Sequence, residues 1–381
     1  MRILMLSHSP NDPDGGASRI YHVLSEGLAA RGHEVDVRHQ EDYGLPTGRL
    51  PRLVVERVGL PQWISRAALS STSPGDHDVV MASGGTMYPL FRRLRASGGP
   101  RPLLVSHAHG MSVYDRIVNL GESRLGHFPA SPAYRAVSAP FSDWWEYRGV
   151  AAADVSVVQN LRDLDQLRTR GTIVHIPPAV HPELLVGSET ITPLDQRVPG
   201  QVLWFGTWES RKGAWYVPRA LRLLRQAFPA ARLVIGGTGK SHEELAAHFD
   251  PADRDALTVL PRVTRAEQMR LMNESQVFLF PSLSEGFGLA LPEAMAFGLA
   301  AVTSPVGFAA DHLTDGLNAR VVPATGEHVG AALVQLVTDD DLRQRIAARG
   351  RETARSFTPE RMVDGYDRLF TEYAGRPVHV P

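Results

Sequence analysis

Short apolar runs alternate with amphipathic segments along most of this chain. Runs of four or five apolar residues, such as 277–280, are typical of buried strands in a parallel sheet. The segments between these runs place apolar side chains three or four positions apart, which predicts helices. The alternation therefore predicts an α/β fold in which both halves of the chain form doubly wound sheets.

The pattern can be assigned to residue ranges. In the first half, apolar residues at helical spacing over 20–28 predict a helix after the first strand. The predicted strands are 2–6, 34–38, 78–82, 103–106, 136–138, 155–158 and 172–176, followed by 202–205, 232–235, 257–260, 277–280 and 299–303. The other predicted helices are 214–228, 242–249, 265–273, 327–337, 339–355 and 359–373.

The length of 381 residues exceeds what one hydrophobic core usually holds, so two domains are expected. A stretch without regular periodicity separates the two halves. It is punctuated by prolines at 177, 178, 182, 193 and 199. We therefore expect an N-terminal domain over 1–180, a linker over 181–200, a C-terminal domain over 201–357 and a last helix within 358–381.

The segment 276–305 carries the strongest functional signal. The strand 277–280 leads into the loop 282–288, and a helix and a further strand follow, which makes a βαβ unit. A ligand of such a unit lies at the carboxyl end of the first strand. The main-chain N–H groups of Gly286, Phe287, Gly288 and Leu289 could meet an anion there, because a helix begins at this point.

Two carboxylates flank this turn. Glu285 lies in the loop, and Glu293 lies about one turn inside the helix. A carboxylate accepts two hydroxyl hydrogen bonds at once, which suits the diols of a hexose or a ribose. Together with Pro281–Ser282 and Gly298, these residues resemble the motif of the retaining glycosyltransferase family four, whose members have the GT-B fold. The open alternative is an ordinary βαβ turn with two solvated glutamates.

The resemblance implies two Rossmann-like domains facing across a cleft, with a last helix that can return to the first domain. It implies a hexosyltransferase that moves a hexose from a UDP- or GDP-sugar to a glycan, lipid or small-molecule hydroxyl, with retention of anomeric configuration. Glu285 would orient the hexose hydroxyls, and Glu293 would hold the ribose. The nucleotide sugar is a co-substrate, and neither a cofactor nor a metal is expected.

A second motif opens the C-terminal domain at 206–213. Lys212 follows a strand and precedes a helix, so it can direct a cation at an anion bound near the helix start. By resemblance, Lys212 would grip the donor diphosphate, and we place it among the catalytic residues. Thr207 stands where the family pattern has an arginine, so one phosphate contact is missing, and Arg211 could replace it. The alternative is a solvated pair of cations at a helix start.

The glycine-rich segment 236–241 invites comparison with an ATP-binding P-loop. That motif needs a glycine five positions before Gly239, and Val234 stands there. The P-loop interpretation therefore fails, and a glycine turn between a strand and a helix remains. By resemblance, Gly237 would lie near the donor phosphates, and Val263 would flank the base.

In the first half, the strand 103–106 runs into a turn that carries His109. By resemblance, His109 would line the reacting face of the donor sugar, while His107 is a poorer choice and a metal site built on both lacks an evident third ligand. Gly15 and Gly16, in the loop after the first strand, match a glycine pair that contacts the phosphates or the acceptor. A hydrogen-bonded loop histidine and a plain tight turn remain the respective alternatives.

Composition sets further bounds. A formal net charge of −1 gives no basic field for a nucleic-acid partner, and the absence of cysteine fits a reducing compartment. The first residues show no signal-peptide core, and no apolar run is long enough to span a membrane. We expect a cytoplasmic protein whose basic amphipathic segment 49–66 either rests on an anionic membrane or packs on the first domain. Its oligomeric state is open.

Two other functions fit the same residues. An epimerase acting on a sugar nucleotide would isomerise its substrate without an acceptor. A non-catalytic nucleotide-sugar binding protein is also possible, since Thr207 departs from the family pattern.

Overall fold

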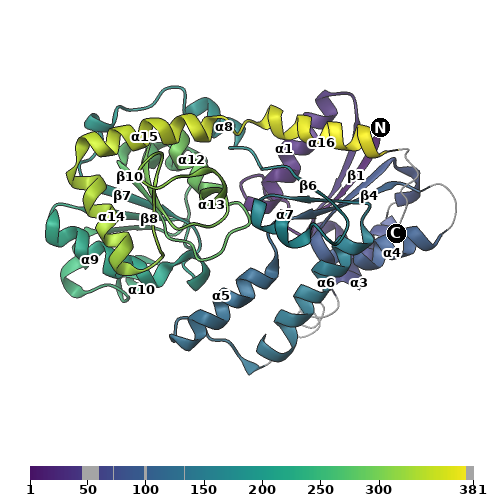
Figure 1. Cartoon of the computed structure of the whole chain (residues 1–381), viewed down its shortest axis with the longest axis horizontal. Helices are drawn as coiled ribbons and strands as arrows, with labels where there is room; N and C mark the ends of the chain where they lie inside the picture. The colour runs from purple at the N-terminus through teal and green to yellow at the C-terminus, as the bar shows by residue number, and fades with distance from the viewer. Residues whose placement is uncertain (45–59, 72, 98–100, 133, 375–381) are drawn as a thin grey trace. The chain divides into compact units, whose positions relative to one another are not determined.

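The computed structural model describes residues 1–44, 60–71, 73–97, 101–132 and 134–374 (Figure 1). The chain divides into two compact units, each built on one six-stranded sheet. Unit 1 contains Met1–Ile117, Ala130–Ala179 and the C-terminal segment that begins at Pro359, and unit 2 contains Val118–Pro129 and Val180–Thr358. All strand pairs in both sheets are parallel within the described residues.

The sheet of unit 1 has the order β2-β1-β3-β4-β5-β6. Its strands are β1 (Arg2–Leu6), β2 (Glu34–Arg38), β3 (Val79–Ser83), β4 (Leu103–Ala108), β5 (Val155–Val158) and β6 (Thr172–His175). The accompanying helices are α1 (Gly16–Ala30), α3 (Leu60–Ser71), α4 (Tyr88–Ala96), α5 (Ser112–Arg124, which continues into unit 2), α6 (Ala139–Ala152), α7 (Leu161–Leu167) and α16 (Pro359–Tyr373). The chain order reverses between β1 and β3, so the loops after these strands lie side by side.

Helix α16 joins unit 1 by packing against α1. Val363 of α16 lies so close to Gly27 that a Cβ on this glycine would come within 2.5 Å of a Val363 methyl group. The contact also includes an ion pair between Arg31 and Asp364. The last helix of the chain therefore completes the unit that the first helix begins.

The sheet of unit 2 has the order β12-β11-β10-β7-β8-β9. Its strands are β7 (Gln201–Phe205), β8 (Arg232–Gly236), β9 (Leu257–Leu260), β10 (Val277–Phe280), β11 (Ala300–Thr303) and β12 (Arg320–Val321). Its helices are α8 (Pro182–Gly187), α9 (Val217–Ala227), α10 (His242–Ala246), α11 (Arg265–Glu274), α12 (Ala290–Ala296), α13 (Phe308–His312), α14 (Gly326–Thr338) and α15 (Asp340–Arg355). Read from β9, this is the Rossmann order, and the chain order reverses between β7 and β10.

Alternate residues of each strand in unit 2 enter different cores. Val202 and Trp204 of β7 belong to the core that also contains the buried faces of α9 and α14. Leu203 and Phe205 belong to the opposite core, which contains the buried residues of α12. Because side chains alternate across a strand, helices cover both faces of the sheet. The predicted α/β class with two doubly wound domains is confirmed.

The structure corrects one predicted strand. Residues 136–138 lie in a π-helical segment, Tyr134–Ser138, which leads directly into α6. A three-residue run such as Ala-Val-Ser fits either periodicity, so the sequence pattern could not separate a strand from a helical turn.

Of the amphipathic segment 49–66, residues 49–59 lie outside the described residues, and α3 begins at Leu60. In the part of the chain that the structure describes, no helix is long and apolar enough to cross a bilayer.

Candidate functional site

The carboxyl ends of β7 and β10 place two predicted motifs beside each other in unit 2. The strands are paired in parallel, with Val277 opposite Val202 and Phe278 opposite Leu203. The loop after β7 carries the 206–213 motif, and the loop after β10 carries Glu285. Both loops therefore leave the sheet at its topological switch point, which is where ligands of open α/β sheets bind.

Lys212 and Glu285 form an ion pair at this point. The Lys212 Nζ lies 2.6 Å from Oε1 of Glu285, and the side chains are 18% and 6% exposed. The Ser282 hydroxyl donates a hydrogen bond of 2.7 Å to the same carboxylate oxygen. Arg211 approaches the other oxygen, with its NH1 at 3.6 Å from Oε2. The structure thus brings together three of the predicted residues, Arg211, Lys212 and Glu285.

Local backbone geometry holds these side chains in position. Gly213 adopts the left-handed conformation with φ of 70°, and a Cβ there would lie 2.0 Å from the carbonyl oxygen of Pro281. The Leu283 N–H donates to the Arg211 carbonyl at 2.8 Å. The two loops are therefore in direct main-chain contact, and only glycine permits this approach at position 213.

The predicted anion-binding turn precedes α12. Gly288 has a φ of 86°, and α12 follows directly. In the first turn of α12 the Leu291 N–H donates to the Gly288 carbonyl at 3.0 Å, and Pro292 carries no N–H. Glu293 lies in α12 with 2% of its surface exposed, and Gln268 of α11 donates to its Oε2 at 3.4 Å. Residues 286–289 and Glu293 thus occupy one end of a helix directly after the loop that contains Glu285.

The remaining residues predicted for unit 2 follow β8 and β9. Gly237 comes directly after β8 and has a φ of 74°. Val263 follows β9, and its Cγ2 would lie 3.0 Å from a Cβ on Gly236. Since β8 pairs with β7 and β9 pairs with β8, both loops emerge from the same edge of the sheet as the Lys212 loop.

His109 lies in unit 1 within a network of polar side chains. Gln159 donates to Nδ1 of His109 at 3.1 Å and to Nε2 of His107 at 3.2 Å. The Ser83 hydroxyl lies 3.5 Å from Nε2 of His109 and 2.8 Å from the Tyr21 hydroxyl. This arrangement favours the His109 tautomer with its proton on Nε2.

Burial keeps these imidazoles neutral. It lowers the pKa of His109 well below the ordinary value, and the nearby imidazoles of His107 and His8 lower it further. Burial, with a smaller effect of His8, also lowers the pKa of His107 to about 3. A neutral His109 can donate a hydrogen bond from Nε2, but it carries no positive charge at physiological pH.

Gly15 and Gly16 lie at the start of α1, also in unit 1. Gly15 is the residue before the helix, and Gly16 is its first residue. A Cβ on Gly16 would meet no atom within 4 Å, so there is open space beside this residue at the start of the helix. The same helix carries Tyr21, whose hydroxyl lies 2.8 Å from the Ser83 hydroxyl of the His109 network.

Several partners of the predicted residues were not singled out from the sequence. Ser282 belonged to the recognised motif without a role, and its hydroxyl holds Glu285. Glu209 accepts a hydrogen bond of 2.6 Å from Thr207 and one of 3.0 Å from Arg211. Over the described ranges, no cluster of three or more His, Asp or Glu side chains suits a metal ion.

Comparison with known proteins identifies the family of the chain. The model of glycosyl transferases group 1 matches residues 198–353, and that of Glycosyltransferase Family 4 matches residues 14–166. The phosphatidyl-myo-inositol mannosyltransferase of Mycolicibacterium smegmatis is 33% identical over 378 residues, which cover 94% of this chain and 90% of the relative. The chain belongs to glycosyltransferase family four.

This family four glycosyltransferase is also similar to proteins whose names state other products. A glycogen synthase of Mycobacterium tuberculosis is 26% identical over 382 residues, covering 92% of this chain and 90% of the relative. The solved structure of a sucrose-phosphate synthase from Thermosynechococcus elongatus superposes with a TM-score of 0.76 at 19% identity, covering 98% of this chain and 99% of that one. The structural likeness confirms the GT-B fold, while the names of these proteins differ in the product formed.

Proposed function

We propose that this glycosyltransferase moves a hexose from a nucleotide diphosphate sugar to an acceptor hydroxyl with retention of anomeric configuration. The observation that carries the proposal is the group of Arg211, Lys212 and Glu285 at the switch point of the sheet in unit 2. It joins two cations that suit a diphosphate to a carboxylate that suits sugar hydroxyls.

The cations would act on the leaving group. As the bond between the anomeric carbon and the diphosphate breaks, negative charge grows on the phosphate oxygens. Lys212 and Arg211 would neutralise that charge, helped by main-chain N–H groups of the turn 286–289 that precedes α12. Because these groups supply positive charge without a bound metal, the proposed reaction is independent of metal.

The carboxylates would fix the donor. Glu285 would accept hydrogen bonds from hexose hydroxyls, and it already receives those of Ser282 and Lys212. Glu293 would accept from both ribose hydroxyls, with Gln268 orienting its carboxylate. His109, neutral and protonated on Nε2, would donate to an oxygen of the donor hexose. Attack by the acceptor hydroxyl on the same face as the leaving diphosphate, with the hydroxyl proton passing to a phosphate oxygen, would give retention.

The first test is a thermal-shift panel on the full chain. UDP, GDP, ADP, dTDP and their hexose conjugates, GDP-mannose among them, are added in the presence of EDTA. A ligand that binds only the folded protein raises its melting temperature, so one base family should give the largest shift. Glu293→Ala should lose that shift, whereas Glu243→Ala, an exposed glutamate of α10, should retain it.

Turnover then separates the possible functions. A transferase releases nucleoside diphosphate at a rate that rises with acceptor concentration, whereas an epimerase converts the donor without acceptor, and a binding protein leaves it intact. If no nucleotide shifts the wild-type protein, or if Glu243→Ala weakens binding as much as Glu293→Ala, the assigned donor site is wrong.

A further inference from the structure

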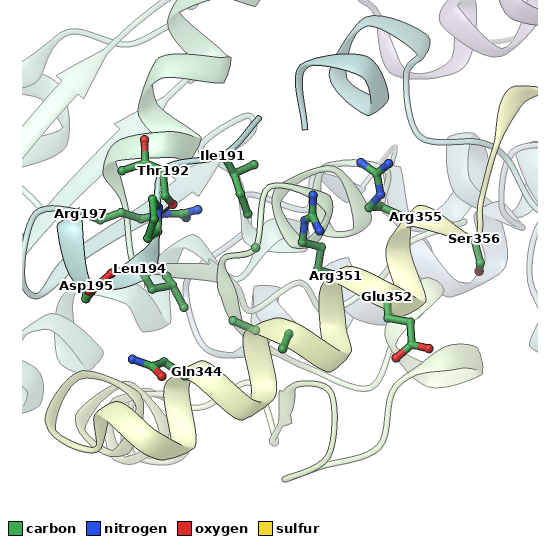
Figure 2. Close-up of a pocket in the computed structure, with 14 residues that line it drawn as sticks. Ile191, Thr192, Leu194, Asp195, Arg197, Gln344, Arg351, Glu352, Arg355 and Ser356 are labelled. Carbon is green, nitrogen blue, oxygen red and sulfur yellow. Dashed lines mark hydrogen bonds between the residues drawn. The ribbon is translucent and has the colours of Figure 1, made fainter. Parts of the chain in front are cut away.

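A pocket lies in unit 2, and none of its lining residues belongs to the loops after β7, β8 and β10. Its volume is about 900 Å³, and it is formed by the segment 191–197, by Gly298 and by α15 (Figure 2). Part of its wall is apolar, with Ile191, Leu194 and Ala347. Three arginines, Arg197, Arg351 and Arg355, and two carboxylates, Asp195 and Glu352, also line it.

The three arginines bind only uncharged groups. Arg197 is 3% exposed and donates four hydrogen bonds, of 2.7–3.1 Å, to four main-chain carbonyls. Arg351 donates to the carbonyls of Ala296 and Ser188 at 3.2 and 2.7 Å. Arg355 donates to the Ser188 hydroxyl at 2.6 Å. Among the described residues, no carboxylate forms an ion pair with any of the three.

The guanidinium groups in this pocket repel one another. Burial, and then the nearby Arg351, lower the pKa of Arg197 to about 10. Burial, and then Arg355, lower the pKa of Arg351. Each guanidinium thus makes its neighbour's charge more costly, and an anion between them would offset that cost.

Capping of helix ends explains only part of this arrangement. Arg197 and Arg351 satisfy carbonyls at the end of α12, and Arg351 and Arg355 satisfy oxygens near the end of α8. These bonds leave the NH1 of Arg351 and the Nε and NH2 of Arg355 without a hydrogen bond to any described residue. Figure 2 shows both guanidinium ends on the same side of α15, whereas the Glu352 carboxylate extends in another direction.

We propose that this pocket binds a phosphate monoester. The forked N–H groups of arginine match the oxygens of a phosphate, and two neighbouring forks can bind one dianion. The apolar residues Ile191, Leu194 and Ala347 would cover the carbon part of the ester. The volume falls in the range of small-molecule sites. Since the lining includes none of the residues assigned to the donor, this site is independent of the proposed transfer reaction.

Calorimetric titration of the full chain tests the site. The probes are inorganic phosphate, hexose 6-phosphate and hexyl phosphate, with hexose and hexanol as uncharged controls. Both esters should bind in preference to the uncharged compounds, and the tighter ester distinguishes a sugar phosphate from a lipid-like phosphate. The double variant Arg351→Gln and Arg355→Gln should weaken binding of that ester at least about tenfold. Arg349→Gln, an exposed arginine of the same helix, should bind it as the wild type does.

A second variant avoids the hydrogen bonds that the arginines make to carbonyls. Ala348 lines the pocket and is exposed, so Ala348→Glu adds a carboxylate there without removing those bonds. It should also weaken binding at least about tenfold, because the new carboxylate can pair with the arginines and repels the phosphate. Lys212→Met, at the assigned donor site, should leave this binding unchanged. The proposal is overturned if no ester binds at millimolar concentration, if Ala348→Glu binds normally, or if Lys212→Met abolishes binding.

Discussion

The pairing of Lys212 with Glu285 can be tested by its effect on stability. Lys212→Met keeps most of the aliphatic length of the side chain and removes its charge. Glu285 then loses its closest partner, at 2.6 Å, while it remains 6% exposed. Such a carboxylate cannot recover its hydration, so the folded state should lose stability.

The magnitude follows from the partners that remain. Removing one member of a buried ion pair costs about 3–5 kcal/mol when the other is left alone. Glu285 retains the Ser282 hydroxyl at 2.7 Å and Arg211 at 3.6 Å. Since these two donors offset part of the loss, we expect the free energy of unfolding to fall by about 2–3 kcal/mol.

Urea unfolding of four proteins measures this directly. They are the wild type, Lys212→Met, Glu285→Gln and the double variant, followed by circular dichroism. Because Gln carries no charge, the double variant should be more stable than the sum of the two losses predicts, with a coupling energy of about 1–2 kcal/mol. Lys240→Met is the control, since its pair with Glu244 is 3.8 Å long and exposed, and it should lose less than about 0.5 kcal/mol.

Two results would refute this reasoning. A coupling energy near zero would mean that Lys212 and Glu285 do not interact in solution. A loss for Lys212→Met no larger than that for Lys240→Met would mean that Glu285 is well hydrated. Unequal slopes of free energy against urea would instead point to a change in the unfolded or native ensemble, and then melting temperatures decide between the variants.

Two further predictions concern single positions. Gly213→Ala should lower the free energy of unfolding by about 1–2 kcal/mol, because Gly213 has a φ of 70°, and by at least about 1 kcal/mol more, because the new Cβ would clash with Pro281. Gly239 also has a φ of 70°, but no atom lies within 4 Å of a Cβ there. In the same urea assay Gly239→Ala should therefore show only the first loss. Equal losses would contradict the packing of the two loops. Burial raises the pKa of Glu146 from 4.5 to about 7, against the hydrogen bonds that it accepts from Ser112. Its protonated form therefore favours the folded state, so this contribution is complete below pH 4.5 and is lost as pH rises through 7, by up to about 3 kcal/mol. Glu146→Gln should remove that pH dependence, and an unchanged pH profile of stability would contradict the raised pKa.

Much of the fold was predictable because buried parallel strands leave continuous apolar runs. The run 277–280 coincides with β10, and 257–260 coincides with β9. The segment 118–129 was not predictable as part of unit 2. It is held there by a hydrogen bond from Tyr216 to Glu122 and by stacking of His127 on Trp215. Isolated polar and aromatic pairs of this kind have no periodicity, so no pattern in the sequence predicts them.

In the candidate site, the sequence predicted individual residues but not the contacts between them. Motif spacing singled out Lys212 and Glu285 separately, but they lie 73 positions apart, and their contact depends on β7 being the neighbour of β10. Strand order is a property of the folded sheet, and the sequence pattern does not encode it locally. For the same reason the residues around His109 were missed, since Tyr21, Ser83 and Gln159 come from three other segments of unit 1.

The departure at Thr207 gains a physical interpretation from these contacts. The family pattern has an arginine there, and its loss would remove one phosphate ligand. In the structure the Thr207 hydroxyl donates to Glu209, which also accepts from NH2 of Arg211. NH1 of Arg211 then lies within 3.6 Å of Glu285 and donates to the Ser284 carbonyl at 3.4 Å. A threonine at 207 therefore helps to hold the arginine at 211 beside Lys212, so two cations still lie at the switch point where the diphosphate is proposed to bind.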